Sequence, residues 1–78
     1  MKSPHIEQLH QECVETLKYL ITQANRTCSI LEAMTEFPIT SDIWHSAVEQ
    51  RVRENQAQAE YQQARERLFN EIRRSQQA

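Results

Sequence analysis

The sequence predicts an all-α fold, a two-helix antiparallel hairpin, from three observations. The 78 residues include no glycine and only two prolines, alongside many Gln, Glu, Arg and Ala, which favour helix. Apolar residues recur every three or four positions over the first half of the chain, the spacing of one helix face. Pro38 interrupts this pattern near the middle of the chain. We therefore expect a single domain, residues 1–78, of two helices joined by a short bend.

The first helix is predicted over about residues 4–35. Ser3 can cap its free N–H groups, and Pro4 suits the first helical position because the N–H that proline lacks would be unpaired there. So wide an apolar face needs a partner in water. The face, called the apolar stripe below, consists of Ile6, Leu9, Cys13, Leu17, Leu20, Ala24, Leu31 and Met34, widened by Val14, Ile21 and Cys28.

The bend is predicted at residues 36–40. Thr40 is a good N-cap for the next helix. With Thr40 as cap, Ile39 and Trp44 occupy the two positions of a hydrophobic staple. Together with Phe37 they would form a small apolar cluster at the bend.

The second helix is predicted over about residues 41–75, with the last residues, 75–78, frayed. Its apolar residues form two sets on different sides of the axis: Trp44, Ala47, Val48, Val52 and Ala59, then Ala57, Tyr61, Ala64, Leu68, Phe69 and Ile72. The stretch 50–58 between them is mostly polar, which leaves two alternatives. The helix contacts different partners along its length, or its middle packs loosely near a polar layer that involves Arg51, Glu54 and Asn55.

A second helix of this kind cannot cover the whole apolar stripe, and a chain this short has little core of its own. We therefore expect a homodimer of hairpins, a four-helix bundle. Its expected core is Ile6, Leu9, Cys13, Leu17, Leu20, Ile21, Ala24, Cys28 and Leu31. Cys13 and Cys28 lie ~22 Å apart along one helix and cannot bond to each other there. If two first helices cross antiparallel near Leu20 and Ile21, Cys13 faces Cys28 of the other copy.

No constellation in the sequence indicates catalysis, a metal site or a cofactor. His10 and Cys13 lie one helical turn apart, but a zinc site needs three or four ligands, and Cys28, His5 and His45 are distant. Two helices also do not enclose a pocket of ordinary ligand size. We therefore expect a protein that is not an enzyme and binds no metal or cofactor.

Charge and hydropathy narrow the partners. The net charge is -2 and the mean hydropathy is -0.79, whereas nucleic-acid binders usually present a strongly basic face. The sequence shows no signal peptide and no apolar run long enough for a membrane span. Two cysteines fit a reducing compartment. We expect a cytoplasmic protein with a protein partner.

The predicted function is that of a small protein-binding module or regulator that associates through its helices. Aromatic and arginine side chains often dominate interfaces. The candidate interaction residues are Phe37, Trp44, Tyr61, Arg65, Leu68, Phe69, Ile72 and Arg73. For Trp44 the alternative is a buried position that closes the hairpin. A nucleic-acid-associated regulator that uses Arg65, Arg67, Arg73 and Arg74 is a further alternative.

The outline, a short helical hairpin with a proline-containing bend at Pro38, resembles two groups of small bacterial or phage proteins. These are phage-encoded regulators that bind a host protein, and the hairpin chaperones of type III secretion and flagellar export. The second resemblance implies a chaperone that holds an amphipathic helix of its client. Trp44 at the start of the second helix is similar to the tryptophan of WXG-type secreted hairpins, but the run Trp44-His45-Ser46 lacks the glycine of that motif.

Overall fold

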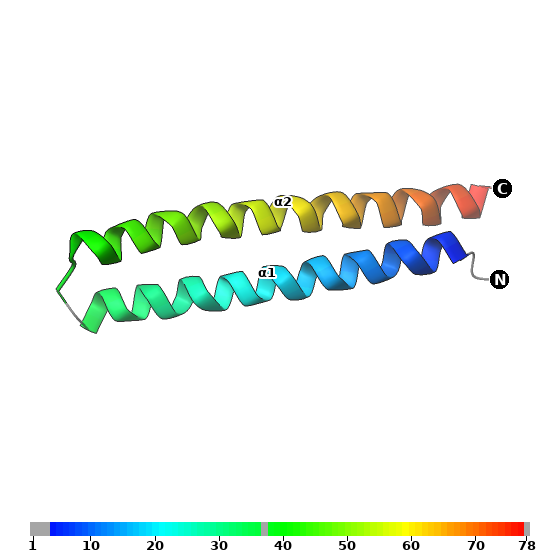
Figure 1. Ribbon diagram of the computed structural model, residues 1–78. Helices are drawn as coiled ribbons and strands as arrows, with labels where there is room; N and C mark the ends of the chain where they lie inside the picture. The colour runs from blue at the N-terminus through cyan, green and yellow to red at the C-terminus, as the bar shows by residue number, and fades with distance from the viewer. Residues whose placement is uncertain (1–3, 37, 78) are drawn as a thin grey trace.

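The computed structural model describes residues 4–36 and 38–77 and consists of two antiparallel helices (Figure 1). Helix α1 spans Pro4–Glu36 and helix α2 spans Ser41–Gln77. They lie side by side over their length and form a rod of 59 × 15 × 14 Å. The predicted all-α hairpin is confirmed. Helix α2 continues through Ser75–Gln77, where we expected fraying, while Ser3 and its expected cap lie outside the described residues.

The bend places Thr40 as the N-cap of α2, as predicted. The backbone N–H of Ile43 donates to Thr40 Oγ1 at 3.3 Å, and that of Trp44 donates to the Thr40 carbonyl oxygen at 3.0 Å. The expected apolar cluster does not bury its members, because Ile39 and Trp44 remain 61% and 57% exposed. Ile43 faces α1, and Trp44, one residue further, is therefore turned away from it. Phe37 lies outside the described residues.

The two helices meet along a row of residues spaced alternately four and three apart, which we call the seam. This is the seven-residue repeat of a coiled coil. In α1 the seam comprises Leu9, Cys13, Thr16, Leu20, Gln23, Thr27, Ile30 and Met34, all buried or half-buried. In α2 it comprises Ile43, Ala47, Gln50, Glu54, Ala57, Tyr61, Ala64 and Leu68, again all buried or half-buried.

The seam buries few apolar side chains fully. Within residues 4–36 and 38–77, the buried apolar residues are Leu9, Ala57, Ala64 and Leu68. The middle of α2 packs at a polar layer in which buried Gln50 bonds to Gln23 of α1. Of the three residues expected near such a layer, Glu54 is half-buried, whereas Arg51 and Asn55 are exposed.

The apolar stripe of α1 is wider than the seam, so α2 covers only part of it. Surface area shows the consequence. A compact monomer of 9.3 kDa should expose about 5,000 Å², and this chain exposes 6372 Å². The hairpin therefore leaves much more surface open to water than a chain of its mass usually does.

Candidate functional site

A second row of apolar residues runs along α1 beside the seam. We call it the α1 row. It comprises Val14, Leu17, Ile21, Ala24, Cys28 and Leu31. Each member directly follows a seam residue, so the row repeats the seam's spacing about 100° further round the helix. Leu17 is 37% exposed, Ile21 51% and Leu31 54%. Apart from half-buried Ala24, the row is the part of the apolar stripe that remains exposed beside α2.

Helix α2 adds apolar side chains to the same side of the hairpin. In an antiparallel pair, the residues that directly follow seam residues lie on the same long side of the hairpin in both helices. The reason is that, seen from one end, the residue numbers wind in opposite senses in the two helices. Trp44 and Val48 meet this condition near the bend, and Phe69 meets it near the open end. Ile72 follows half-buried Glu71, which continues the repeat three residues after Leu68. A groove of about 350 Å³ lined by Ile6, Glu7, His10, Leu68 and Ile72 joins this side of both helices. We call the α1 row and these four α2 residues the apolar face.

The opposite side of the hairpin is polar. Residues that precede seam positions gather there, among them Glu12 of α1 and Glu60 and Arg67 of α2, which line a common groove of about 310 Å³. Tyr19 is a large hydrophobic side chain on this side, and it is 49% exposed. The hairpin is thus amphipathic as a whole, with one apolar and one polar long side.

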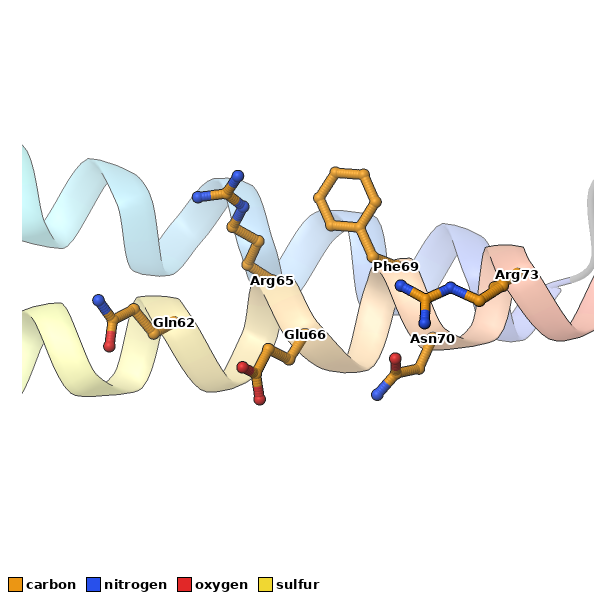
Figure 2. Close-up of a pocket in the computed structure, with 6 residues that line it drawn as sticks. All are labelled: Gln62, Arg65, Glu66, Phe69, Asn70 and Arg73. Atoms are coloured by element: carbon orange, nitrogen blue, oxygen red, sulfur yellow. The ribbon is translucent and has the colours of Figure 1, made fainter.

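The open end of α2 carries a shallow depression (Figure 2) lined by Gln62, Arg65, Glu66, Phe69, Asn70 and Arg73. The Arg65 guanidinium carbon lies 5.7 Å from the centre of the Phe69 ring, within reach of a cation–π interaction. In Figure 2 the Arg65 and Phe69 side chains project to the same side of the helix. All six lining residues come from one helix, so the depression has no second wall and would leave a small ligand largely in water.

The structure brings some predicted interaction residues together and separates others. Arg65, Phe69 and Arg73 share the depression on α2, and Trp44 is exposed on the apolar face rather than buried at the bend. Tyr61 and Leu68 instead lie in the seam, where they contact α1, and Ile72 is half-buried at its edge.

The expected dimer core is likewise divided. Leu9, Cys13 and Leu20 belong to the seam within one hairpin, and Ile6 is half-buried at its end. Leu17, Ile21, Ala24, Cys28 and Leu31 belong to the α1 row. Because Cys13 and Cys28 lie on different sides of α1, a second copy packed on the apolar face would meet Cys28 and not Cys13. Both cysteines are free thiols.

A buried pair of glutamines at the seam was not predicted from the sequence. Gln23 is 2% and Gln50 4% exposed. Gln50 Nε2 donates to Gln23 Oε1 at 2.9 Å and to the Gln23 carbonyl oxygen at 3.0 Å. A signal existed: Gln23 lies seven residues from Thr16 and Ile30, and Gln50 seven from Ile43 and Ala57. A search for residues spaced seven apart, with polar residues included, would have found the pair.

One titratable group on the apolar face is perturbed. The Cys28 thiol donates a hydrogen bond to Glu32 Oε1, at 3.5 Å between the heavy atoms. This hydrogen bond, with the negative charge of the same carboxylate, raises the pKa of Cys28 above its ordinary value. The thiol therefore stays protonated and weakly nucleophilic near neutral pH.

Among the described residues, no three His, Cys, Asp or Glu side chains lie close enough to hold a metal ion. Neither helix, over the same part of the chain, is apolar enough over a sufficient length to cross a membrane. Comparison with models of protein families, with curated proteins and with solved structures finds no match.

Proposed function

We propose that the chain is a non-enzymatic binding module that associates with another polypeptide through its apolar face. The observation that carries the proposal is the gathering of half-exposed Leu17, Ile21, Leu31, Trp44 and Val48 on one side of the hairpin. Isolated exposed apolar residues are ordinary, but a contiguous patch of them marks an interaction surface.

Burial of this face supplies a useful free energy. Covering the remaining half of a Leu, Ile or Trp side chain contributes about 1 kcal/mol at ~25 cal/mol per Å². Several such side chains together approach the entropy cost of association, which is about 4–15 kcal/mol. The face is long and straight and lies between two helices, which suits an amphipathic helix or another helical hairpin as the occupant.

The arginines support a protein partner over a nucleic acid. Arg65 follows a seam residue and lies on the apolar side, whereas Arg67 precedes one and lines the grooves of the polar side. Arg73 lies on the outer surface of α2 beside Arg65 and Glu66. The basic charge is therefore spread over three sides and mixed with carboxylates. Among Arg65, Arg67 and Arg73 no single basic strip forms along which phosphates would bind.

The test compares two matched variants in binding to a partner. Ile21→Gln removes an apolar side chain from the apolar face, and Tyr19→Gln removes one of similar exposure from the polar side. Each immobilised protein is incubated with the lysate of the source cell, and captured proteins are quantified by mass spectrometry. The proposal expects a partner that is retained by the wild type and by Tyr19→Gln and is lost with Ile21→Gln. Equal loss with both variants, or no retained protein, would overturn it.

A further inference from the structure

We propose that a second copy of this chain covers the α1 row. The two hairpins are related by a two-fold axis beside Thr22 and Gln23, so their α1 helices run antiparallel and their bends point in opposite directions. This inference rests on the proposed function, because it names one occupant of the apolar face. Three features of the structure carry it: the symmetry of the row, the area available and the small number of apolar side chains that the seam buries fully.

The α1 row is complementary to its own reversed copy. Its six members are spaced three, four, three, four and three residues apart, which reads the same in both directions. An axis at the midpoint sets Val14 opposite Leu31 of the copy, Leu17 opposite Cys28 and Ile21 opposite Ala24. The last two pairs each join a large side chain to a small one, which allows the helices to interdigitate. No member is charged, so the paired rows themselves contain no like charges that face each other.

The overlap is large enough for a stable dimer. With this axis Glu36 of one copy lies opposite Leu9 of the other, so about 28 residues of each α1 overlap, a length of about 42 Å. At the 15 Å width of the hairpin, each copy contributes a footprint of roughly 600 Å². Both footprints together reach about 1,200–1,300 Å², at the lower end of the range for specific stable interfaces. The corrugation of side chains adds to this projected area.

A second copy also supplies what the hairpin lacks. The buried apolar residues found so far in the seam, Leu9, Leu68, Ala57 and Ala64, lie toward the open end and the middle. In the bend half of the seam the buried residues are Gln23 and Gln50, whereas the apolar seam residues there are only half-buried, namely Ile30, Met34, Ile43 and Ala47. The α1 row is richest in that same half, so pairing the rows adds apolar contact where the seam buries least. Chains with small cores commonly obtain stability in this way.

The dimer leaves one end of the apolar face free. Gln23 pairs with Gln50, and the helices run in opposite directions, so Leu9 lies level with Ala64. The part of α2 beyond Ala64 therefore extends past the overlap. Arg65, Phe69 and Arg73 remain open at each end of the dimer for a different partner.

Cysteine crosslinking tests the geometry directly. In a Cys13→Ser background, Leu17→Cys should form a disulfide with Cys28 of the second copy under mild oxidation. Residues 17 and 28 of the same helix lie about 16 Å apart by helical rise, and so do the two Cys28 residues of the dimer. Both separations are far beyond the ~6 Å between the Cα atoms of bonded cysteines. The expected product is a dimer of about 19 kDa, twice the 9.3 kDa chain, with the 17–28 crosslink identified by peptide mapping.

Two controls make the result decisive. Tyr19→Cys, on the polar side, should not crosslink. Trp44→Cys should not crosslink either, because Trp44 lies level with Cys28 of the other copy only if the hairpins pack with their bends at the same end. Circular dichroism confirms that each variant is helical, which is expected because Leu17, Tyr19 and Trp44 are all more than a third exposed. A crosslink at Trp44→Cys, or equal crosslinking at Leu17→Cys and Tyr19→Cys, would overturn the proposed dimer.

Sedimentation separates this inference from the proposed function. The wild type should sediment as a dimer at micromolar concentration, and Ile21→Asp should sediment as a monomer. A wild-type chain that stays monomeric, with no crosslink at Leu17→Cys, would overturn the second copy as occupant. The capture experiment with Ile21→Gln and Tyr19→Gln would still decide whether another protein occupies the face.

Discussion

The buried glutamine pair offers the sharpest test of how the hairpin is held in register. We consider Gln50→Leu, Gln23→Leu and the double variant. Gln50→Leu removes both hydrogen bonds of Gln50 Nε2 and leaves Gln23 Oε1 buried without its donor. A buried polar group that loses its partner costs about 1–3 kcal/mol. The carbonyl oxygen of Gln23 keeps the hydroxyl of Thr27 as a donor, at 3.1 Å, so the side-chain oxygen accounts for most of the loss.

The double variant should behave differently. Leucine is close to glutamine in volume, and two leucines pack against each other without any unpaired polar atom. Replacing both partners of a buried hydrogen bond by apolar groups of the same shape is about neutral or stabilising. We therefore expect Gln50→Leu to lower the free energy of unfolding by about 1–2 kcal/mol. Gln23→Leu should cost less, about 0.5–1 kcal/mol, because Gln50 Nε2 keeps its hydrogen bond to the backbone carbonyl oxygen of residue 23. The double change should restore the stability, so the coupling energy is about 1.5–3 kcal/mol, as found for residues in direct contact.

Urea unfolding followed by circular dichroism measures these energies, at one fixed chain concentration because association would add to the stability. Gln56→Leu is the matched control, since Gln56 lies on the exposed side of α2 and should change stability by less than about 0.5 kcal/mol. If both single variants are as stable as the double variant, the pair does not carry the energy assigned to it. The seam would then have to be aligned by other residues.

Three further predictions concern the core, the cap and the thiol. Leu9→Ala should lower the free energy of unfolding by about 2–4 kcal/mol because Leu9 is 7% exposed, whereas Val52→Ala, at a 51% exposed position, should change it by less than ~0.5 kcal/mol in the same urea titration. Thr40→Ala should cost about 1 kcal/mol through loss of the cap, seen as a lower melting temperature, and Thr40→Ser should restore it. Glu32→Gln should lower the pKa of Cys28, because it weakens the hydrogen bond that the thiol donates, by making the acceptor neutral, and removes the carboxylate's negative charge; the alkylation rate of Cys28 should then rise at a lower pH than in the wild type, and an unshifted profile would contradict the assigned cause.

The first helix and the bend were predictable because their signals are strong and local. The three- and four-residue spacing of large apolar residues identified α1, and Pro38 with Thr40 located the bend and the cap. Helix α2 was predictable as a helix from propensity alone, since it has few large apolar residues. Its end was placed too early, at Ser75, because Gln76 and Gln77 are good helix formers that carry no stop signal.

The second half of the α2 seam was grouped as one apolar set from the sequence, with Ala57, Tyr61, Ala64 and Leu68 among its members. The half near the bend was not predictable by hydrophobicity, because it includes Gln50 and Glu54, while residues of types found in the seam, such as Gln58 and Ala59, are exposed. The buried and the exposed residues differ in their position in a seven-residue repeat. That repeat becomes visible only when polar residues are counted as possible seam positions. The split of the α1 stripe has the same origin. The sequence shows that Leu17 and Leu20 share a broad face, but only the direction of α2 decides that Leu20 is covered and Leu17 is not.

The seam and the apolar face therefore divide two tasks between them. A shift of the helices by one heptad would place Gln50 opposite Thr16 or Ile30 in place of Gln23, which would break the pair formed by the two amide side chains. The pair thus favours one alignment even though it adds little net stability. In that alignment Trp44 of α2 lies about level with Cys28 of α1, and Val48 lies about level with Ala24, so apolar residues from both helices form one patch near the bend. The side chains that could add most to stability lie outside the seam, and they act only when something packs on them. Folding and association of this hairpin should accordingly be linked, with a stability that rises with the concentration of whatever occupies the apolar face.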